Sequence, residues 1–197
     1  MVNRTIYFVR HGITRSNIEK IYAGWSEEEL TEEGIAQVNK LGKEMQKCGI
    51  SDIYTSPIRR AVQTAEFLNE FIKGEIIIEP DLKEMKMGPW ERLSEHEIEN
   101  KYPKEYKIWL ERPADLMIHR RETLHKVQLR AVKAINKILK RYSERISLCV
   151  THVAIIRCIF LYFNQLPLNS YKKIEVPNAS IHKLVLNNDK IIMKKTR

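Results

Sequence analysis

The sequence predicts an α/β fold, a three-layer α/β/α sandwich around a mostly parallel β-sheet. Runs of β-branched and aromatic residues, typical of buried strands, alternate with segments whose apolar residues recur at helical spacing. Strands that alternate with helices favour a sheet covered by helices on both faces. A chain of 197 residues fits one domain that buries roughly 70% of its unfolded surface. We therefore expect a single domain over residues 1–197.

Two elements are predicted before residue 50. Residues 5–9 (TIYFV) end at a turn that contains glycine, which indicates a buried strand. Residues 31–49 predict an amphipathic helix, because a Thr-Glu-Glu-Gly start precedes apolar residues at helical spacing. Side chains that follow the strand should therefore lie at its carboxyl end.

The middle of the chain predicts two short strands and an irregular segment. Residues 52–55 and 76–79 are the strands, and between them Ser56 is expected to cap a helix that has Pro57 in its first turn. Residues 82–120 contain prolines, aromatic residues and many charges. We expect this segment to form short helices and loops, an insert that lies as a lid over the functional site.

In the last part of the chain, predicted helices and strands alternate again. Residues 122–141 place their apolar side chains on one stripe and predict a long helix, which is followed by a strand over 146–151. Residues 153–163 predict another helix. Residues 181–186 and 191–193 predict a terminal hairpin that turns across Asn187-Asn188-Asp189.

The composition excludes several classes of protein. No stretch approaches membrane-spanning length, no signal-peptide core follows the N-terminus, and the three cysteines are scattered without a C-x-x-C pair. We expect a cytoplasmic protein. The formal net charge of +9 is interpreted as Lys and Arg on solvated helix faces rather than as a nucleic-acid surface, and the field would also attract small anions.

Charged and nucleophilic side chains follow three of the predicted strands. Arg10-His11-Gly12 follows the first, residues 56–60 (SPIRR) follow the second, and Thr151-His152 ends the strand after the long helix. Ligands of open α/β sheets bind at the carboxyl ends of the strands. Two histidines and at least two arginines should therefore converge, which is the combination that phosphoryl transfer needs: a nitrogen nucleophile and fixed cations.

Four motifs, in order along the chain, give this site a family resemblance. They are residues 10–17 (RHGITRSN), 30–34 (LTEEG), 55–65 (TSPIRRAVQTA) and 82–91 (LKEMKMGPWE). With these motifs the chain resembles the histidine phosphatase superfamily, which includes cofactor-dependent phosphoglycerate mutases and many small-molecule phosphatases. The resemblance implies a phosphoglycerate mutase-like fold. At Ile13 and Val153 the chain departs from the residue types common in the family.

The resemblance implies a role for each motif residue. His11 would be the nucleophile that becomes phosphohistidine, and Glu84 the general acid and base. Arg10, Arg60 and His152 would form the charged cradle for the phosphoryl group. The candidate substrate-binding residues are Asn17, Thr14, Gly24 and Val153.

The implied activity is the hydrolysis of small-molecule phosphate monoesters. Two alternatives stay open, a cofactor-dependent phosphoglycerate mutase and a catalytically silent anion-binding member of the fold. We expect no metal and no cofactor, a small phosphorylated substrate as the partner, no nucleic acid and no membrane, with a homodimer left open. As contacts for an acidic substrate we expect Arg112, Arg120 and Arg121.

Overall fold

The computed structural model describes residues 4–141, 146–187 and 190–195. It contains a six-stranded sheet in the order β3-β2-β4-β1-β5-β6. The first four strands along the chain run parallel to one another, whereas β5 is antiparallel to its neighbours β1 and β6. The strands are β1 (Arg4–Arg10), β2 (Ile50–Thr55), β3 (Glu75–Ile78), β4 (Ile146–Thr151), β5 (Ile181–Asn187) and β6 (Lys190–Lys195).

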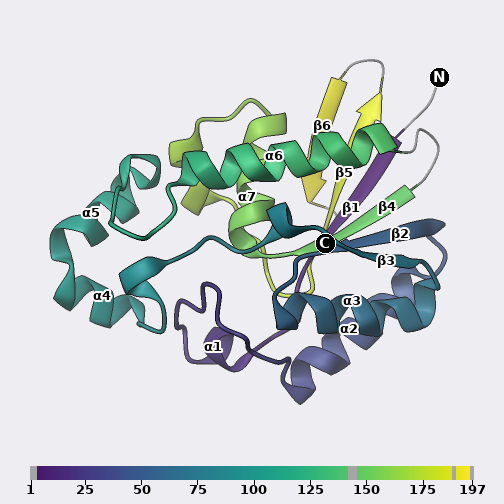
Figure 1. Ribbon diagram of the computed structural model, residues 1–197, viewed down its shortest axis with the longest axis horizontal. Helices are drawn as coiled ribbons and strands as arrows, with labels where there is room; N and C mark the ends of the chain where they lie inside the picture. The colour runs from purple at the N-terminus through teal and green to yellow at the C-terminus, as the bar shows by residue number, and fades with distance from the viewer. Residues whose placement is uncertain (1–3, 142–145, 188–189, 196–197) are drawn as a thin grey trace.

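Helices cover both faces of the sheet, so the predicted three-layer α/β/α architecture is confirmed (Figure 1). Helices α2 and α3 pack together on one face, and α6 and α7 pack together on the other. Shorter helices project from one end of the sheet. The α-helices are α1 (Arg15–Ile18), α2 (Glu32–Met45), α3 (Arg59–Ile72), α4 (Glu95–Lys101), α5 (Pro103–Glu111), α6 (Leu124–Arg141) and α7 (Val153–Phe163).

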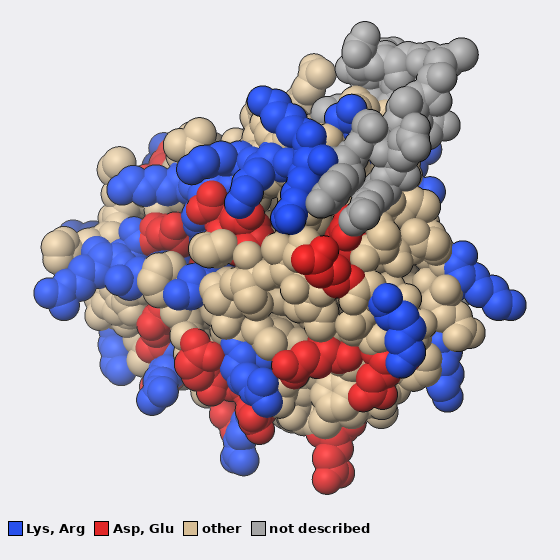
Figure 2. All heavy atoms as spheres, turned by 45° about the vertical axis from the view of Figure 1, so that its right-hand side comes forward, with Lys and Arg blue, Asp and Glu red and all other residues tan. Residues whose placement is uncertain are grey.

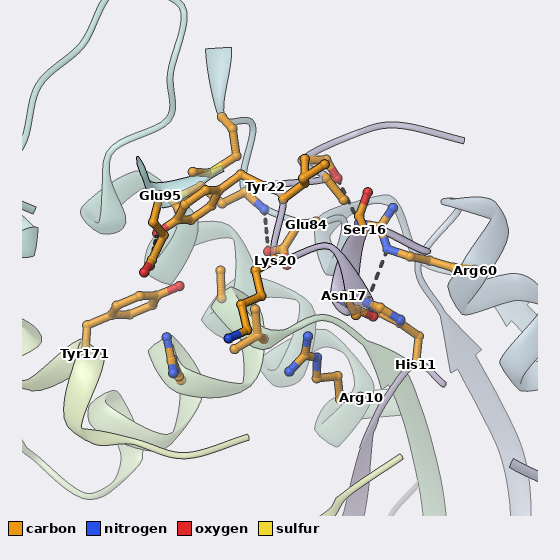
Figure 3. A pocket seen from close by; sticks show the side chains of 18 of the residues that line it. Arg10, His11, Ser16, Asn17, Lys20, Tyr22, Arg60, Glu84, Glu95 and Tyr171 are labelled. Atoms are coloured by element: carbon orange, nitrogen blue, oxygen red, sulfur yellow. Dashed lines mark hydrogen bonds between the residues drawn. The ribbon is translucent and has the colours of Figure 1, made fainter. Parts of the chain in front are cut away.

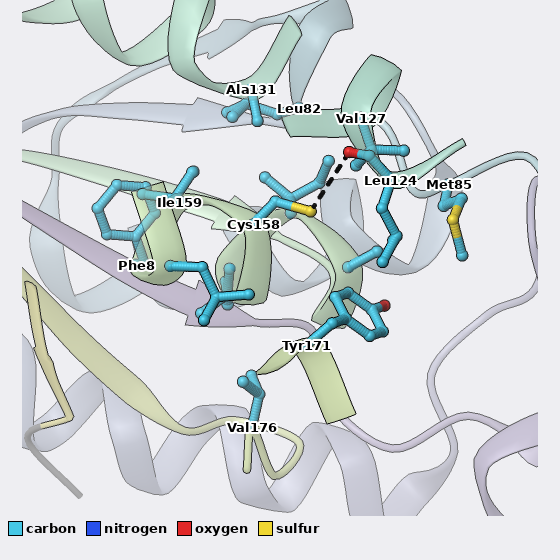
Figure 4. Close-up of a cluster of buried hydrophobic side chains, with 14 of the residues drawn as sticks. Phe8, Leu82, Met85, Leu124, Val127, Ala131, Cys158, Ile159, Tyr171 and Val176 are labelled. Atoms are coloured by element: carbon cyan, nitrogen blue, oxygen red, sulfur yellow. Dashed lines mark hydrogen bonds between the residues drawn. The ribbon is translucent and has the colours of Figure 1, made fainter. Parts of the chain in front are cut away.

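Two apolar clusters form the core, one on each face of the sheet. Successive side chains of a strand point to opposite faces, so Phe8 joins the cluster under α6 and α7 whereas Val9 joins the cluster under α2 and α3. In the first cluster Phe8 lies near Ile159 and Cys158, and the Cys158 thiol contacts the carbonyl of Leu124 (Figure 4). Packing on both faces fixes the position of β1, and with it the position of the residues that follow.

The register of the parallel strands brings three chain segments to one edge. Arg10 is paired with Thr151 across β1 and β4, and Thr55 is paired with Val150 across β2 and β4. His11, Ser56 and His152, which come next along the chain, therefore leave the sheet side by side. This convergence is the one that the strand ends in the sequence predict.

The start of α3 differs from the prediction. The helix begins at Arg59 with Ile58 as its N-cap, so the expectation that Ser56 caps it with Pro57 in the first turn is wrong. The Ser56 hydroxyl is buried; it accepts a hydrogen bond from the Ile58 N–H and contacts His152, 2.7 Å away. Ser56 therefore does not cap α3 and instead lies among the residues that follow the strand ends.

The other predicted elements are present with shifted ends. Thr31 caps α2 through a hydrogen bond from Gly34, but the helix ends at Met45, before Gly49. The predicted terminal hairpin is formed by β5 and β6; of its expected turn, Asn188 and Asp189 lie outside the described residues. No helix in the described part of the chain is both long and apolar enough to cross a membrane.

Basic side chains gather over the upper part of one face, where α6 runs, with acidic side chains beside them (Figure 2). Lys137 pairs with Glu79 at 2.7 Å, and Lys133 pairs with Asp81 at 3.9 Å. These ion pairs agree with the interpretation that much of the positive charge decorates solvated helix faces.

Candidate active site

A cavity of about 400 Å³ opens at the carboxyl edge of the sheet (Figure 3). Its inner end is formed by the residues after β1 and by the start of α3, and residues 20–24 form one side. Side chains between Glu84 and Trp109 form the opposite wall. Helix α7 and the 3₁₀ helix η4 (Leu168–Lys173) close the outer end.

His11 is buried at the inner end and is held as a neutral imidazole. Its Nδ1 lies 2.8 Å from the Gly12 carbonyl, which can only accept, so Nδ1 carries the proton and Nε2 keeps a lone pair. Burial, and then the charges of Arg60 and Arg10, hold the pKa of His11 well below its ordinary value of 6.5. At neutral pH Nε2 is therefore unprotonated, and its lone pair accepts a hydrogen bond from Arg60 Nε at 3.2 Å.

Backbone carbonyls orient two arginines around this nitrogen. Arg60 donates from Nη1 to Ser26 at 2.9 Å and from Nη2 to Gly24 at 2.8 Å, while its Nε lies 3.2 Å from His11 Nε2. Arg10 donates to the Val176 carbonyl at 2.7 Å. Burial lowers the pKa of Arg10 to about 10, so the guanidinium stays charged at neutral pH.

Gly24 has a steric reason to be glycine. Its φ is +52°, and a Cβ atom there would lie 2.4 Å from the Glu91 carboxylate. The residue lines the cavity, as expected, and its carbonyl also aims Arg60. Val153, another expected contact, lines the cavity at the start of α7.

His152 lies beside His11, with 5.2 Å between the ring centroids. Its Nε2 lies 2.7 Å from the Ser56 hydroxyl oxygen, which also accepts a hydrogen bond from the Ile58 N–H. Among the described residues Nδ1 has no hydrogen-bond partner. Ser56, which the sequence predicts to be a helix cap, lies in the site instead.

Asn17 is oriented by an amide network. Its Oδ1 receives hydrogen bonds from the Thr14 N–H at 3.1 Å and from Asn178 Nδ2 at 2.9 Å, so its own NH₂ group turns toward the cavity. Thr14 is buried outside the lining of the cavity, and its hydroxyl also donates to Asn17 Oδ1 at 3.2 Å. Asn178, which also contacts the His11 carbonyl at 3.0 Å, was not predicted from the sequence.

Glu84 supplies the carboxyl group that faces the cavity from the opposite wall. Burial raises its pKa above the ordinary value of 4.5, although a hydrogen bond from the Met85 N–H and the nearby arginines act against this shift. Its carbonyl accepts hydrogen bonds from Trp25 Nε1 at 2.6 Å and from Arg130 Nη2 at 2.9 Å. The backbone that carries the carboxyl group is therefore fixed on both sides.

The three arginines expected to contact an acidic substrate are placed elsewhere. None of Arg112, Arg120 and Arg121 lines the cavity. Arg112 is exposed beside Asp115, and Arg121 is buried against the rings of Trp90 and Trp109. The cations that do line the outer end were not predicted from the sequence: Lys20, Arg157 and Lys172.

No group of three or more His, Cys, Asp or Glu side chains is placed to hold a metal ion within residues 4–141, 146–187 and 190–195.

An α/β sandwich that brings two histidines, two arginines and a buried carboxyl group to its strand ends defines the histidine phosphatase class. The sequence pattern of the histidine phosphatase superfamily (branch 1) matches residues 6–197, and the chain belongs to this family. The family resemblance inferred from the four motifs is thus confirmed.

Individual relatives lie at moderate distance. The chain is 26% identical over 183 residues to a probable phosphoglycerate mutase, GpmB, of Proteus mirabilis, with 93% of this chain and 85% of the relative covered. It is 26% identical over 175 residues to phosphoserine phosphatase 1 of Hydrogenobacter thermophilus, with 89% and 83% covered. The solved structure of Bacillus stearothermophilus YhfR has a TM-score of 0.92 at 27% identity, over 98% of this chain and 96% of that one.

Proposed function

We propose that this protein hydrolyses small-molecule phosphate monoesters through a phosphohistidine intermediate on His11, with Glu84 as the general acid and base. The observation that carries the proposal is the state of His11: its Nδ1 is held by the Gly12 carbonyl, and its unprotonated Nε2 lies 3.2 Å from Nε of Arg60. A neutral imidazole with one unprotonated nitrogen beside a fixed cation suits attack on a phosphoryl group.

In the first half-reaction the phosphoryl group sits between the cations. Arg10, Arg60 and His152 take up charge on its oxygens, and the amide NH₂ of Asn17 adds a hydrogen bond. The Nε2 lone pair of His11 forms the new P–N bond as the ester P–O bond breaks. The proton on Glu84 passes to the departing alkoxide, which leaves as an alcohol.

In the second half-reaction the Glu84 carboxylate takes a proton from water, and the oxygen of that water attacks phosphorus. The P–N bond breaks, the lone pair returns to His11 Nε2, and inorganic phosphate leaves. Glu84 is again protonated. The raised pKa of its carboxyl group supports this role, because a carboxyl group must hold a proton near working pH to act as an acid.

Further features belong to the same proposal. The fixed arginines and His152 replace a metal clamp, so we expect activity to persist in the presence of a chelator.

We infer that residues 82–120 act as a lid, since Glu84, Met87 and Trp109 border the cavity. The free cysteines suit the reducing environment of the cytoplasm.

Phosphoglycerate mutase is the second candidate function, because the relative from Proteus mirabilis is described as one. Phosphatase is favoured, because a relative of equal identity is described as a phosphoserine phosphatase and the segment 82–120 lacks a Glu-Arg-Arg-Tyr-type substrate motif. The deciding experiment supplies 3-phosphoglycerate and follows inorganic phosphate and 2-phosphoglycerate together. Release of phosphate supports the phosphatase, whereas isomerisation without release supports the mutase.

A catalytically silent anion-binding protein is the remaining alternative. It predicts that the wild-type chain cleaves no ester in a broad panel of phosphate monoesters and forms no acid-labile phosphohistidine. Either activity on one ester or a label on His11 contradicts it.

A further inference from the structure

A second group of cations lines the outer end of the cavity. Lys20 follows α1, Arg157 lies on α7, and Lys172 lies in η4, so three separate elements contribute. Figure 3 shows the Lys20 ammonium group pointing into the cavity between Arg10 and Tyr171. Cations from distant parts of the chain that meet in one cavity need an explanation beyond a solvated surface.

Aromatic rings and a carbonyl hold two of these cations in place. Arg157 donates from Nε to the Ile174 carbonyl at 2.7 Å, and its guanidinium lies 4.9 Å from the centroid of the Tyr171 ring. The Lys172 ammonium lies 5.5 Å from the centroid of the Trp109 ring. Both side chains are thus oriented by uncharged groups, although Glu95 also attracts Lys172.

No carboxylate of the described residues forms an ion pair with Lys20, Arg157 or Lys172. Glu95 is the acidic side chain at this end of the cavity, and one of its oxygens accepts a hydrogen bond from the Tyr22 hydroxyl at 3.0 Å. The outer end therefore carries a surplus of positive charge.

Cations line the cavity from its inner end to its outer end. Burial lowers the pKa of both Arg10 and Lys172; Glu84 acts against this shift at Arg10 and Glu95 acts against it at Lys172, whereas the charge of Arg157 lowers both pKa values further. A phosphoryl group between Arg10 and Arg60 neutralises these inner cations. The outer cations, Lys20, Arg157 and Lys172, then still face the leaving group of the substrate.

We propose that Lys20, Arg157 and Lys172 form a second anion subsite that binds a carboxylate on the leaving group of the ester. The inference rests on the proposed function and specifies its substrate class: small phosphorylated carboxylic acids. Arg157 offers a planar fork suited to a carboxylate, and a cavity of about 400 Å³ accommodates a small acid. Glu95 at the same end disfavours a second, dianionic phosphate in that position.

The test compares two esters that differ in one group, 3-phosphoglycerate and glycerol 3-phosphate, in which a hydroxymethyl group replaces the carboxylate. We expect the wild type to prefer 3-phosphoglycerate in kcat/KM by about tenfold or more, the effect of one charge-assisted hydrogen bond. Lys172→Gln and Arg157→Gln should remove most of this preference, because kcat/KM should fall several-fold more for 3-phosphoglycerate than for glycerol 3-phosphate. Lys140→Gln, an exposed lysine on α6, is the matched control and should change neither value.

The two proposals fail in different ways. Equal kcat/KM for both esters in the wild type, or equal losses on both esters in Lys172→Gln and Arg157→Gln, overturns the subsite and leaves the phosphatase proposal standing. If the wild type cleaves no ester and forms no phosphohistidine, the proposed function fails. In that case calorimetric dissociation constants for the two esters still test the subsite, since it requires tighter binding of 3-phosphoglycerate to the wild type than to Lys172→Gln.

Discussion

The Nε of Arg60 lies 3.2 Å from Nε2 of His11 and donates a hydrogen bond to it. This donor orients the imidazole, and a phosphoryl group that bonds to Nε2 takes the place of this hydrogen bond. The other two nitrogens of Arg60 are held by the carbonyls of Gly24 and Ser26, which keep the guanidinium beside His11. The Arg60 side chain therefore links His11, the proposed nucleophile, to the loop that contains Gly24 and Ser26.

Arg60→Lys should abolish this three-point arrangement, since an ammonium group cannot satisfy three acceptors in one plane. We expect kcat for p-nitrophenyl phosphate to fall by about 10² to 10³, the usual cost of losing a preorganised donor to a developing charge. Arg59→Lys is the matched control, because Arg59 is exposed and pairs with Glu29 and Glu66. Arg60→Lys with activity within threefold of the wild type contradicts the assigned role.

Glu84→Gln should separate the two half-reactions. An alkyl phosphate needs a proton on its leaving group, so its turnover should fall by about 10² to 10⁴. p-Nitrophenolate leaves without a proton, but hydrolysis of the phosphohistidine still needs the base. Stopped-flow absorbance should therefore show a burst of p-nitrophenolate followed by slow turnover. Equal losses on both substrates with no burst would remove Glu84 from the acid and base role.

Ser56→Ala should weaken catalysis without unfolding the chain. The variant loses the hydroxyl that contacts Nε2 of His152 at 2.7 Å and orients its ring, so we expect kcat to fall by about tenfold, one hydrogen bond to a charged transition state. Ser51→Ala serves as the control, because Ser51 lies near the start of β2, at the end of the strand far from Ser56. The melting temperatures show whether the two variants keep the fold. Full activity in folded Ser56→Ala contradicts the assignment.

Two buried histidines predict acid sensitivity of the fold. The pKa values of His11 and His152 lie well below 6.5 in the folded chain, mainly because of burial. The unfolded chain therefore binds more protons below about pH 6.5, and stability that is complete above this pH is lost as the pH falls. Each histidine adds a slope of about 1.4 kcal/mol per pH unit to the free energy of unfolding.

Urea titrations between pH 7.5 and 5 measure this slope. His11→Asn has no imidazole ring at this position. The pH dependence of the free energy of unfolding should therefore lose the contribution of one histidine. His96→Asn, on the exposed side of α4, should leave it unchanged. Identical slopes in the wild type and His11→Asn would show that His11 is not held neutral by the fold.

Gly34→Ala should disturb the loop that follows His11. A Cβ atom at this position would lie 2.3 Å from the Ile13 carbonyl, where only a hydrogen atom fits. We expect the free energy of unfolding to fall by about 1 to 3 kcal/mol. Glu33→Ala, an exposed change in the same turn of α2, is the control, and chemical denaturation compares the two. If the free energy of unfolding of Gly34→Ala equals that of the wild type, the loop that follows His11 accommodates the added methyl group without loss of stability.

The layers of the fold and the inner end of the site were predictable because both follow from short patterns. Apolar periodicity fixes which face of each helix is buried, and a parallel sheet places all of its carboxyl ends at one edge. Arg10, His11 and His152 leave neighbouring strands there, and Arg60 lies in the first turn of the helix that follows β2.

The outer end of the site was not predictable by the same reasoning. Asn178 reaches the His11 carbonyl across 167 positions of the chain, and no local pattern encodes such a contact. Charge alone did not show which basic side chains face the cavity. Arg121 turns onto two tryptophan rings, whereas Lys172 and Arg157 come from elements after the expected lid. Tertiary packing decides these orientations.

The most direct test of the account is to trap the phosphoryl group on the protein. Glu84→Gln and the wild type are mixed with a ³²P-labelled monoester, quenched in alkali and mapped by peptide analysis. We expect an acid-labile, alkali-stable label on His11, most abundant in Glu84→Gln, and no label in His11→Ala. Ester hydrolysis without any protein-bound phosphate, or a label that survives in His11→Ala, would contradict His11 as the phosphoryl carrier.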